Sequence, residues 1–246
     1  MRNRQIFFRI VFRARSTALL FAVLGLLFAA VCAKAQTRSI NSTKAHYEDF
    51  IPEGDTILDI ARGDLNKDGN EDIVLALRDS DEDENTDYEE NDSIKSNPRL
   101  LLVLLKTDSG YVCVSRSEDA ILCKGCGGIF GDPFDGITIK KGVLTLSQYG
   151  GSAWRWSYKD KFQYRNGDMY LIGTTKWTYW NVKYCKKLDD FADAEHEDVN
   201  LITGDRVVKQ ISEDCKLVEN YKDKIKTHPL KRLSEFKLPM DEEDKE

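Results

Sequence analysis

The 246-residue sequence has few of the residues and motifs that common enzyme classes use. Its three histidines, His46, His196 and His228, lie in polar or terminal stretches, where we expect surface side chains rather than general bases. The motifs G-x-S-x-G and H-E-x-x-H and the Walker phosphate loop are absent. The signatures of α/β-hydrolases, zinc peptidases and P-loop nucleotidases are therefore excluded, and a binding protein is favoured over an enzyme.

Long hydrophobic runs are also scarce. The run from Ala18 to Val31 is shorter than the about 20 residues that a membrane-spanning helix needs. It follows an arginine-rich start and precedes Ala33-Lys34-Ala35, which is the pattern of a secretory signal peptide with an A-x-A cleavage site. We predict that residues 1–35 are a signal cleaved near Ala35. The protein would then be exported to the periplasm or outside the cell, without stable membrane insertion; the alternative is a retained anchor.

Basic residues are too few to balance the acidic ones. Removing the predicted signal leaves 30 of the 36 basic residues against 42 acidic residues, a net charge of about −12. Binding of nucleic acids and of anionic membranes requires basic patches. We therefore expect no nucleic-acid partner, and consider a glycan or an envelope protein instead.

The exported chain would contain an odd number of cysteines, so at least one thiol has no partner within the chain. Disulfides are expected in an oxidising compartment, and Cys123 and Cys126 are the candidates for one. A zinc site is the alternative, although Cys185 and Cys215, its second pair of ligands, are farther apart in the sequence than the usual C-x₂₋₄-C spacing. That site would use four thiolates, those of Cys123, Cys126, Cys185 and Cys215.

Patterning predicts a mainly β fold: a single antiparallel β-sheet domain, built as a sandwich or curved sheet, with few short helices. Apolar or alternating runs predict the strands: 56–61, 72–77, 100–105, 111–115, 137–140, 143–149, 153–165, 199–203, 206–211 and 218–225. The domain spans residues 51–238 and includes an acidic loop at 79–97. A flexible segment, 36–50, precedes it, and a charged tail, 239–246, follows it. Residues 186–198 are interpreted as an acidic turn region, and His228-Pro229 as the start of a short helix.

A long hairpin is the strongest structural prediction. Asn166-Gly167 is typical of a two-residue type I′ turn, which sets the register of its two strands. The register predicts four apolar pairs on one face: Tyr164 with Met169, Phe162 with Leu171, Trp156 with Trp177, and Trp154 with Tyr179. The opposite face would carry a basic stripe of Arg155, Lys159, Lys161 and Arg165. The shorter hairpin around Lys141-Gly142 would pair Ile139 with Leu144 and Ile137 with Leu146.

The aromatic face has two interpretations. Because the opposite face is cationic, burial of the aromatic face as the core is favoured. Alternatively, the aromatic side chains are a platform for sugar rings, which requires that Trp154 and Trp156 be exposed; its members would be Trp154, Trp156, Tyr158, Trp177 and Tyr179.

The stretch with the most specific chemistry is an oxygen-rich loop. Its side chains alternate with other residues, and a glycine follows the third: Asp64, Asn66, Asp68, Gly69, Asn70 and Asp72. Oxygen ligands at alternate positions are typical of Ca²⁺ loops, although Leu75 occupies the position of the closing glutamate of an EF-hand. We predict that the five oxygen-bearing residues bind one structural Ca²⁺; a polar turn that binds nothing is the alternative.

Two resemblances extend these predictions. The loop Gly63–Val74 resembles the calcium loop of FG-GAP and VCBS repeats, but it occurs once, whereas a propeller built from such repeats needs several copies. The segments 130–134 (FGDPF), 149–156 (YGGSAWRW) and 164–173 (YRNGDMYLIG) resemble an uncharacterised family of exported bacterial proteins and lipoproteins. That resemblance implies export and a single domain but no reaction.

The combined prediction is a secreted or periplasmic, non-enzymatic binding or envelope-associated module with a structural Ca²⁺ loop. The alternative is a hydrolase that acts on envelope or extracellular polysaccharide. Its paired carboxylates would be Asp132 and Asp135, which flank Pro133-Phe134 in a glycine-rich loop. Capping of that loop is the other role for the two aspartates.

Overall fold

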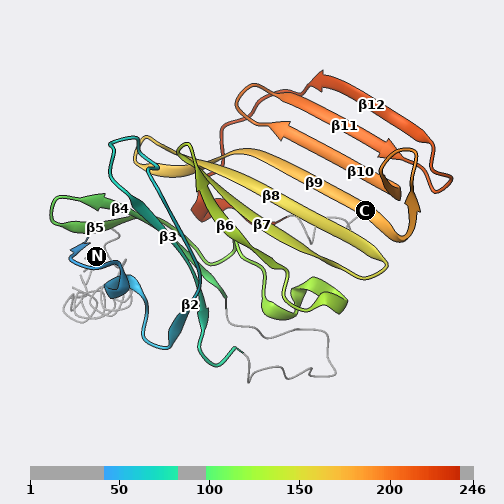
Figure 1. The fold of residues 1–246 in the computed structure, drawn as a ribbon. Helices are drawn as coiled ribbons and strands as arrows, with labels where there is room; N and C mark the ends of the chain where they lie inside the picture. The colour runs from blue at the N-terminus through green and yellow to red at the C-terminus, as the bar shows by residue number, and fades with distance from the viewer. Residues whose placement is uncertain (1–41, 83–97, 239–246) are drawn as a thin grey trace, which may run out of the picture. The chain divides into compact units, whose positions relative to one another are not determined.

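The computed structural model describes residues 42–82 and 98–238, which lie in one compact unit and form two antiparallel sheets (Figure 1). The predicted signal peptide, the charged tail and residues 83–97 of the acidic loop lie outside the described residues. Sheet A has the strand order β1-β5-β4-β3-β2, and sheet B has the order β12-β11-β10-β9-β8-β7-β6. The prediction of a mainly β, antiparallel fold is confirmed.

The strands of sheet A are β1 (Thr43–Lys44), β2 (Asp55–Gly63), β3 (Asp72–Asp79), β4 (Leu100–Thr107) and β5 (Gly110–Ser117). Those of sheet B are β6 (Phe134–Lys140), β7 (Val143–Gly151), β8 (Trp154–Arg165), β9 (Asp168–Cys185), β10 (Asp190–Asn200), β11 (Asp205–Ile211) and β12 (Leu217–Lys224). Short 3₁₀ helices lie between or beside them: η2 (Tyr47–Phe50), η3 (Lys124–Phe130) and η4 (Leu233–Glu235).

The main core lies between the two sheets. Val74 and Val103 of sheet A belong to the same buried cluster as Leu146 and Phe162 of sheet B. Each fully buried side chain of this size contributes about 1.5–3 kcal/mol to folding. Edge strands β2 and β6 also meet, because Asp59 Oδ2 accepts a hydrogen bond of 3.0 Å from the Ile137 amide.

Strand β3 is buried on both faces, as its continuous apolar run predicts. Val74 and Ala76 face the main core, whereas Ile73, Leu75 and Leu77 belong to a second cluster. Side chains from residues 47–51 cover this second cluster. Residues 42–50 lie in the segment that we predicted to be flexible. They form β1 and η2 instead, because their side chains pack against the outer apolar face of sheet A.

Both predicted tight turns have type I′ character. Asn166 and Gly167 have φ values of 50° and 88°, and Lys141 and Gly142 have φ values of 54° and 77°. Two consecutive positive φ values match the right-handed twist of the flanking strands. The predicted pairs Ile139–Leu144, Ile137–Leu146, Tyr164–Met169 and Phe162–Leu171 are confirmed.

The other two predicted pairs of the long hairpin are wrong. Phe162 pairs with Leu171 but Lys161 pairs with Gly173, so Ile172 is the extra residue of a β-bulge. A one-residue shift moves every later side chain of β9 to the opposite face. Beyond it, Trp156 faces Thr178 and Trp154 faces Trp180.

Two further predictions for the C-terminal half are corrected. The acidic stretch 186–198 contains most of β10, which alternates buried Ala192 and Ala194 with charged neighbours and pairs with both β9 and β11. Pairing on both sides overrides the low strand propensity of acidic residues. The helix predicted from His228-Pro229 is limited to η4, while Leu233 and Phe236 are buried in the main core.

Four cysteines form two disulfide bonds. The predicted Cys123–Cys126 bond is present, and Cys185 is bonded to Cys215. The alternative four-thiolate zinc site is therefore wrong. Cys113 is a free, buried thiol. Disulfides are typical of proteins in oxidising compartments. No helix within residues 42–82 and 98–238 is long and apolar enough to cross a membrane.

Candidate functional site

The predicted cation loop connects β2 to β3 and is closed by hydrogen bonds from its own backbone. Asp64 accepts hydrogen bonds from the amides of Asp68 (3.1 Å) and Gly69 (3.0 Å), and Asn66 Oδ1 accepts one from Asp68 (3.0 Å). Asp68 Oδ1 accepts a bond of 2.7 Å from the Asn70 amide, which lowers the pKa of Asp68. The oxygens of Asp64, Asn66 and Asp68 are thus brought together around one turn.

Asp72 differs from the other four predicted ligands. It is fully buried, and its two carboxylate oxygens accept hydrogen bonds from the amides of Leu65 (2.8 Å) and Lys106 (2.9 Å). Burial raises the pKa of Asp72, although these bonds oppose the shift. Asp72 therefore joins the loop to β4, whatever else it binds.

The donor set fits Ca²⁺ in its chemistry, since every candidate ligand is a carboxylate or amide oxygen. Gly69, with φ of 90°, makes the sharp turn that such a loop requires. Within residues 42–82 and 98–238, no three His, Cys, Asp or Glu side chains are placed to hold a metal ion together. The side chains that the loop brings together are those of Asp64, Asn66 and Asp68, and one of these three is an asparagine.

Sheet B has a groove on the face that carries Trp154. It has a volume of about 410 Å³ and is lined by Trp154, Thr178, Asp193, Glu195, Gln210, Ile211, Ser212 and Val218. Trp154 lies on the same face of β8 as the buried Phe162, but 54% of its surface is exposed. Figure 1 shows why, because β10–β12 extend sheet B beyond sheet A. The aromatic face of β8 is therefore buried in the core at Phe162 and lines the groove at Trp154.

The two candidate glycan-binding tryptophans have different environments. Trp154 projects into the groove, whereas Trp156 is half-buried and packs against the main core. Trp156 also packs beside Tyr158, at a ring-centroid distance of 5.6 Å. The face that we predicted as uniform thus leaves one indole available to a ligand.

The groove combines an indole with hydrogen-bonding side chains of several kinds. Thr178, Gln210 and Ser212 provide hydroxyl and amide groups, and Asp193 and Glu195 provide carboxylates. No lysine, arginine or histidine is among these lining residues. The groove therefore favours neutral or cationic ligands over anionic ones.

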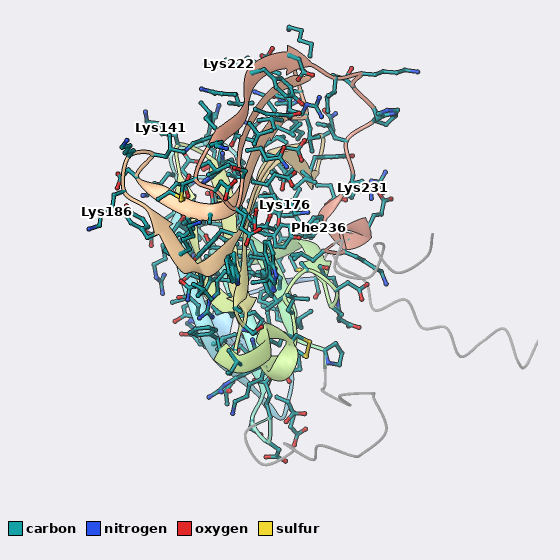
Figure 2. The ribbon with its side chains drawn as sticks, turned by 90° about the vertical axis from the view of Figure 1, so that its right-hand side faces the viewer. Lys141, Lys176, Lys186, Lys222, Lys231 and Phe236 are labelled. Atoms are coloured by element: carbon teal, nitrogen blue, oxygen red, sulfur yellow. A yellow bond between two sulfur atoms is a disulfide. The ribbon has the colours of Figure 1, made fainter. Side chains whose placement is uncertain are left out.

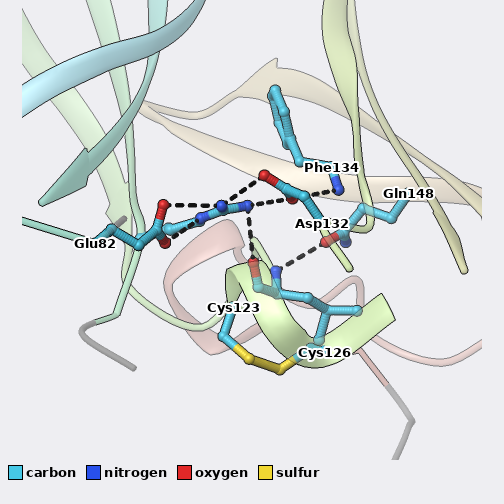
Figure 3. The surroundings of a disulfide bond; sticks show 8 residues. Glu82, Cys123, Cys126, Asp132, Phe134 and Gln148 are labelled. Atoms are coloured by element: carbon cyan, nitrogen blue, oxygen red, sulfur yellow. Dashed lines mark hydrogen bonds and ion pairs between the residues drawn. A yellow bond between two sulfur atoms is a disulfide. The ribbon is translucent and has the colours of Figure 1, made fainter. Parts of the chain in front are cut away.

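Of the two aspartates of the hydrolase alternative, Asp135 is exposed and Asp132 is held by an arginine. Asp132 forms two hydrogen bonds of 2.7 Å with the guanidinium of Arg99, whose other side binds Glu82 at 2.7 and 2.9 Å (Figure 3). Burial opposes ionisation of Asp132, but these bonds outweigh it and lower its pKa. A general acid needs a raised pKa, so Asp132 instead anchors the glycine-rich loop.

The outer face of sheet B, opposite to Trp154, carries a cluster that the sequence analysis did not predict. Phe191, Tyr179, Trp177 and His196 stack in a row, with ring centroids 4.5, 4.2 and 4.9 Å apart. The bulge at Ile172 creates this row, because it turns Trp177 and Tyr179 away from the face of Trp154. Strict alternation along the sequence does not reveal such a one-residue shift.

His196 is part of a polar group beside this row. Its Nε2 lies 2.8 Å from Asp190 Oδ2, which also accepts a bond of 2.7 Å from Lys209. Burial opposes the ionisation of Asp190, but the bonds from Lys209 and the Phe191 amide outweigh it and lower the pKa of Asp190. His196 is half-buried, unlike His46 and His228, which are exposed as we predicted. Its proximity to Asp190 depends on the two bulges in the pairing of β10 with β9.

Comparison with known proteins finds no matching family model, curated protein or solved structure. The resemblances to FG-GAP and VCBS loops and to exported bacterial proteins therefore stay predictions.

Proposed function

We propose that the protein is an exported, non-enzymatic module that binds glycans in the groove at Trp154. The observation that carries this proposal is an indole with 54% of its surface exposed, beside a groove lined with polar side chains. An aromatic ring packs against the C–H face of a sugar, while hydroxyl, amide and carboxylate groups fix its orientation. An envelope or extracellular polysaccharide is the fitting ligand class.

The charge of the groove narrows this class. Asp193 and Glu195 line it, and no basic side chain does. A polyanionic glycan would meet like charges, which disfavours binding. We therefore expect neutral sugars, or sugars with an ammonium group that the two carboxylates and the indole face attract.

The replacement Trp154→Ala tests the groove. We expect it to weaken binding to a neutral or amino-sugar polysaccharide by at least about tenfold, or about 1.4 kcal/mol, because exposed indoles at binding sites are often dominant contacts. Retardation in affinity gels containing cellulose, β-1,3-glucan or chitosan derivatives, followed by calorimetry with the best oligosaccharide, measures the effect. Unchanged affinity would show that Trp154 does not contact the bound polysaccharide.

The matched control is Tyr184→Ala, since Tyr184 also belongs to sheet B, on β9, is 48% exposed and does not line the groove. Its affinity should equal that of the wild type. Incubation of the same polysaccharides with the protein distinguishes the hydrolase alternative. If new reducing ends are released, and Glu195→Gln abolishes their release, the protein is a hydrolase that uses the carboxylates of Asp193 and Glu195.

The loop at residues 64–72 is our proposed site for one structural Ca²⁺. Asp64, Asn66, Asp68 and Asn70 would bind the ion, and Asp72 would connect the site to Leu65 and Lys106. The support is that Asp64 and Asn66 both accept the Asp68 amide, which gathers their oxygens. When bound, Ca²⁺ would stabilise the entry to β3 and take no part in a reaction.

Addition of calcium should stabilise the protein. At a free Ca²⁺ concentration one hundred times the Kd, the gain is about 2.7 kcal/mol, which corresponds to a rise in Tm of roughly 5–10 °C. Differential scanning calorimetry with millimolar Ca²⁺ or EDTA measures it. Asp68→Ala should lose the shift, whereas Glu71→Gln, at an exposed position between the predicted ligands, should keep it. Identical melting in Ca²⁺ and EDTA would refute the site.

The two disulfides, together with the predicted signal at residues 1–35, support export. The particular compartment, periplasmic or extracellular, belongs to the same proposal. Fractionation of cells that produce the full chain, with N-terminal sequencing of the product, tests both export and cleavage after Ala35.

A further inference from the structure

The outer face of sheet B contains a buried arginine whose hydrogen-bond donors are not satisfied. Arg155 is 8% exposed, and its Nε and Nη1 atoms are buried without a partner among the described residues. Arg99 is a useful comparison, because it is also buried but binds Glu82, Asp132 and the Leu122 carbonyl oxygen. Native proteins normally satisfy buried guanidinium groups in the way that Arg99 does. These two donors of Arg155 are therefore available to an acceptor from outside the chain.

Aromatic rings, rather than carboxylates, surround this guanidinium. Its Cζ atom lies 3.3 Å from the centroid of the Phe130 ring and 6.0 Å from that of Tyr149. Phe130 and Tyr149 are themselves in contact, with centroids 5.9 Å apart. Ring faces attract a cation but accept no hydrogen bond of ordinary strength. The charge is thus held in place by stacking, with Nε and Nη1 unused.

Neighbouring donors add to this surplus. Arg155 lies directly opposite Tyr179 on β9, and Trp177 is the next residue on the same face. The indole Nε1 of Trp177 is also buried without a partner among the described residues. Burial, followed by the 3.2 Å hydrogen bond with the Tyr149 hydroxyl, raises the pKa of Tyr179 to about 12. One of these two hydroxyls donates to the other, so the pair has one O–H proton left for an outside acceptor.

Asp190, the acid beside the aromatic row on this face, already has hydrogen-bond partners. The carboxylate of Asp190 accepts hydrogen bonds from His196 and Lys209, so it does not neutralise Arg155. A group of donors without an acceptor is complementary to an anion. A planar carboxylate can form two parallel N–H···O bonds with a guanidinium. Each such pair uses Nη2 together with either Nε or Nη1, as the two carboxylates bound to Arg99 show.

We propose that this cluster, formed by Phe130, Tyr149, Arg155, Trp177 and Tyr179, binds a carboxylate-bearing sugar. The carboxylate would bind one edge of the Arg155 guanidinium and accept a hydrogen bond from one of its free donors, Nε or Nη1, and the sugar ring would pack against the aromatic side chains. Phe130 covers the guanidinium now, but half of its own surface is exposed. It follows Ile129, which is 80% exposed, and precedes Gly131, whose φ is 72°. The ring of Phe130 must therefore turn aside when a ligand enters.

This site is separate from the groove. Trp154 and Arg155 are consecutive residues of β8, so their side chains point to opposite faces of sheet B. The two faces also have opposite preferences, because carboxylates line the groove and a cation is at the centre of the outer cluster. Binding at Arg155 therefore does not depend on glycan binding at Trp154.

Calorimetric titration of the purified protein with galacturonate, glucuronate and mannuronate trimers tests the proposal. At least one trimer should bind with a Kd below about 1 mM, the range of a weak but specific site. Its methyl ester, which has the same ring but no charge, should bind at least about tenfold more weakly, because it loses the charge-assisted pair. Absence of binding by all three trimers, or equal binding of acid and ester, would overturn the proposal.

Variants locate the site. Arg155→Met should reduce affinity for the trimer at least about tenfold, and Arg155→Lys should have an intermediate effect because it keeps the charge and loses the planar fork. Trp154→Ala, which alters the opposite face of sheet B, should leave the affinity for the trimer unchanged. Wild-type affinity in Arg155→Met, or loss of binding in Trp154→Ala alone, would place the carboxylate elsewhere.

A melting measurement separates binding from a structural role. A guanidinium kept for a ligand gives the free protein little stability, so Arg155→Met should melt at or above the temperature of the wild type. A clearly lower Tm without ligand would show that Arg155 serves the fold, and would count against the proposal. Because the ester comparison uses only the wild-type protein, it remains decisive if a variant folds poorly.

Discussion

Replacing Arg99 with methionine is expected to lower the free energy of unfolding by about 3–5 kcal/mol, because it leaves the buried Glu82 carboxylate without its cation. The Arg99 side chain is fully buried and bridges Glu82, at the end of the β3 region, to Asp132 in the glycine-rich loop (Figure 3). Burial opposes its charge, but the bonds to Asp132 and Glu82 outweigh this and raise the pKa of Arg99. Arg99 therefore stays charged at every pH at which the protein is folded.

Urea unfolding monitored by fluorescence measures this loss. Arg206→Met is the control, since Arg206 also binds a carboxylate, that of Asp223, with two hydrogen bonds, but on the surface. Surface ion pairs contribute little, so this variant should unfold close to the wild type. Adding Glu82→Gln to Arg99→Met should recover part of the loss. Equal effects of the two arginine substitutions would contradict our account of the buried bridge.

The replacement Asp160→Asn should stabilise the protein at neutral pH and have little effect at acidic pH. Asp160 is 3% exposed on the inner face of β8, and one of its carboxylate oxygens is buried without a partner among the described residues. Burial raises the pKa of Asp160 to about 6 from a usual value of 3.8. The folded protein therefore binds the proton more tightly than the unfolded chain does.

The sign of the pH dependence follows from this difference. Below about pH 4 the carboxyl is protonated in both states and costs nothing. Between about pH 4 and pH 6 the unfolded chain loses this proton while the folded protein keeps it, so wild-type stability falls by about 3 kcal/mol over that interval. The side-chain amide in the Asp160→Asn variant does not titrate, so its advantage should appear between about pH 4 and pH 7 in urea unfolding. The exposed Asp108→Asn is the control. A constant difference between variant and wild type across this range would contradict the prediction.

Sheet B ends in a strand that is exposed to solvent. Figure 2 shows side chains along the full length of sheet B, from Phe236 in the core to Lys222 on β12. Lys141 and Lys186, which lie in the turns after β6 and β9, are at the periphery. Strand β12 is exposed throughout. Strands β9–β11 carry a buried cluster of their own, so β12 is the strand of sheet B whose side chains are exposed along its whole length.

Local physical chemistry in the sequence was sufficient for most of the strands and for the tight turns. Alternation has a period of two residues, and a type I′ turn needs only two residues with positive φ, so neighbours along the chain determine both. The pairs Tyr164–Met169 and Ile139–Leu144 follow from these rules. The Cys123–Cys126 bond is local in the same sense, with a separation of three residues.

Only the tertiary structure decided which face each aromatic side chain occupies. One extra residue at Ile172 reverses the direction of Trp177 and Tyr179, and its position depends on pairing with both neighbouring strands. The Cys185–Cys215 bond, the burial of Arg155 under Phe130 and the exposure of Trp154 likewise depend on contacts between distant segments. Residue type and spacing determine where strands begin and turn, whereas the burial and partners of a side chain are properties of the assembled sheets.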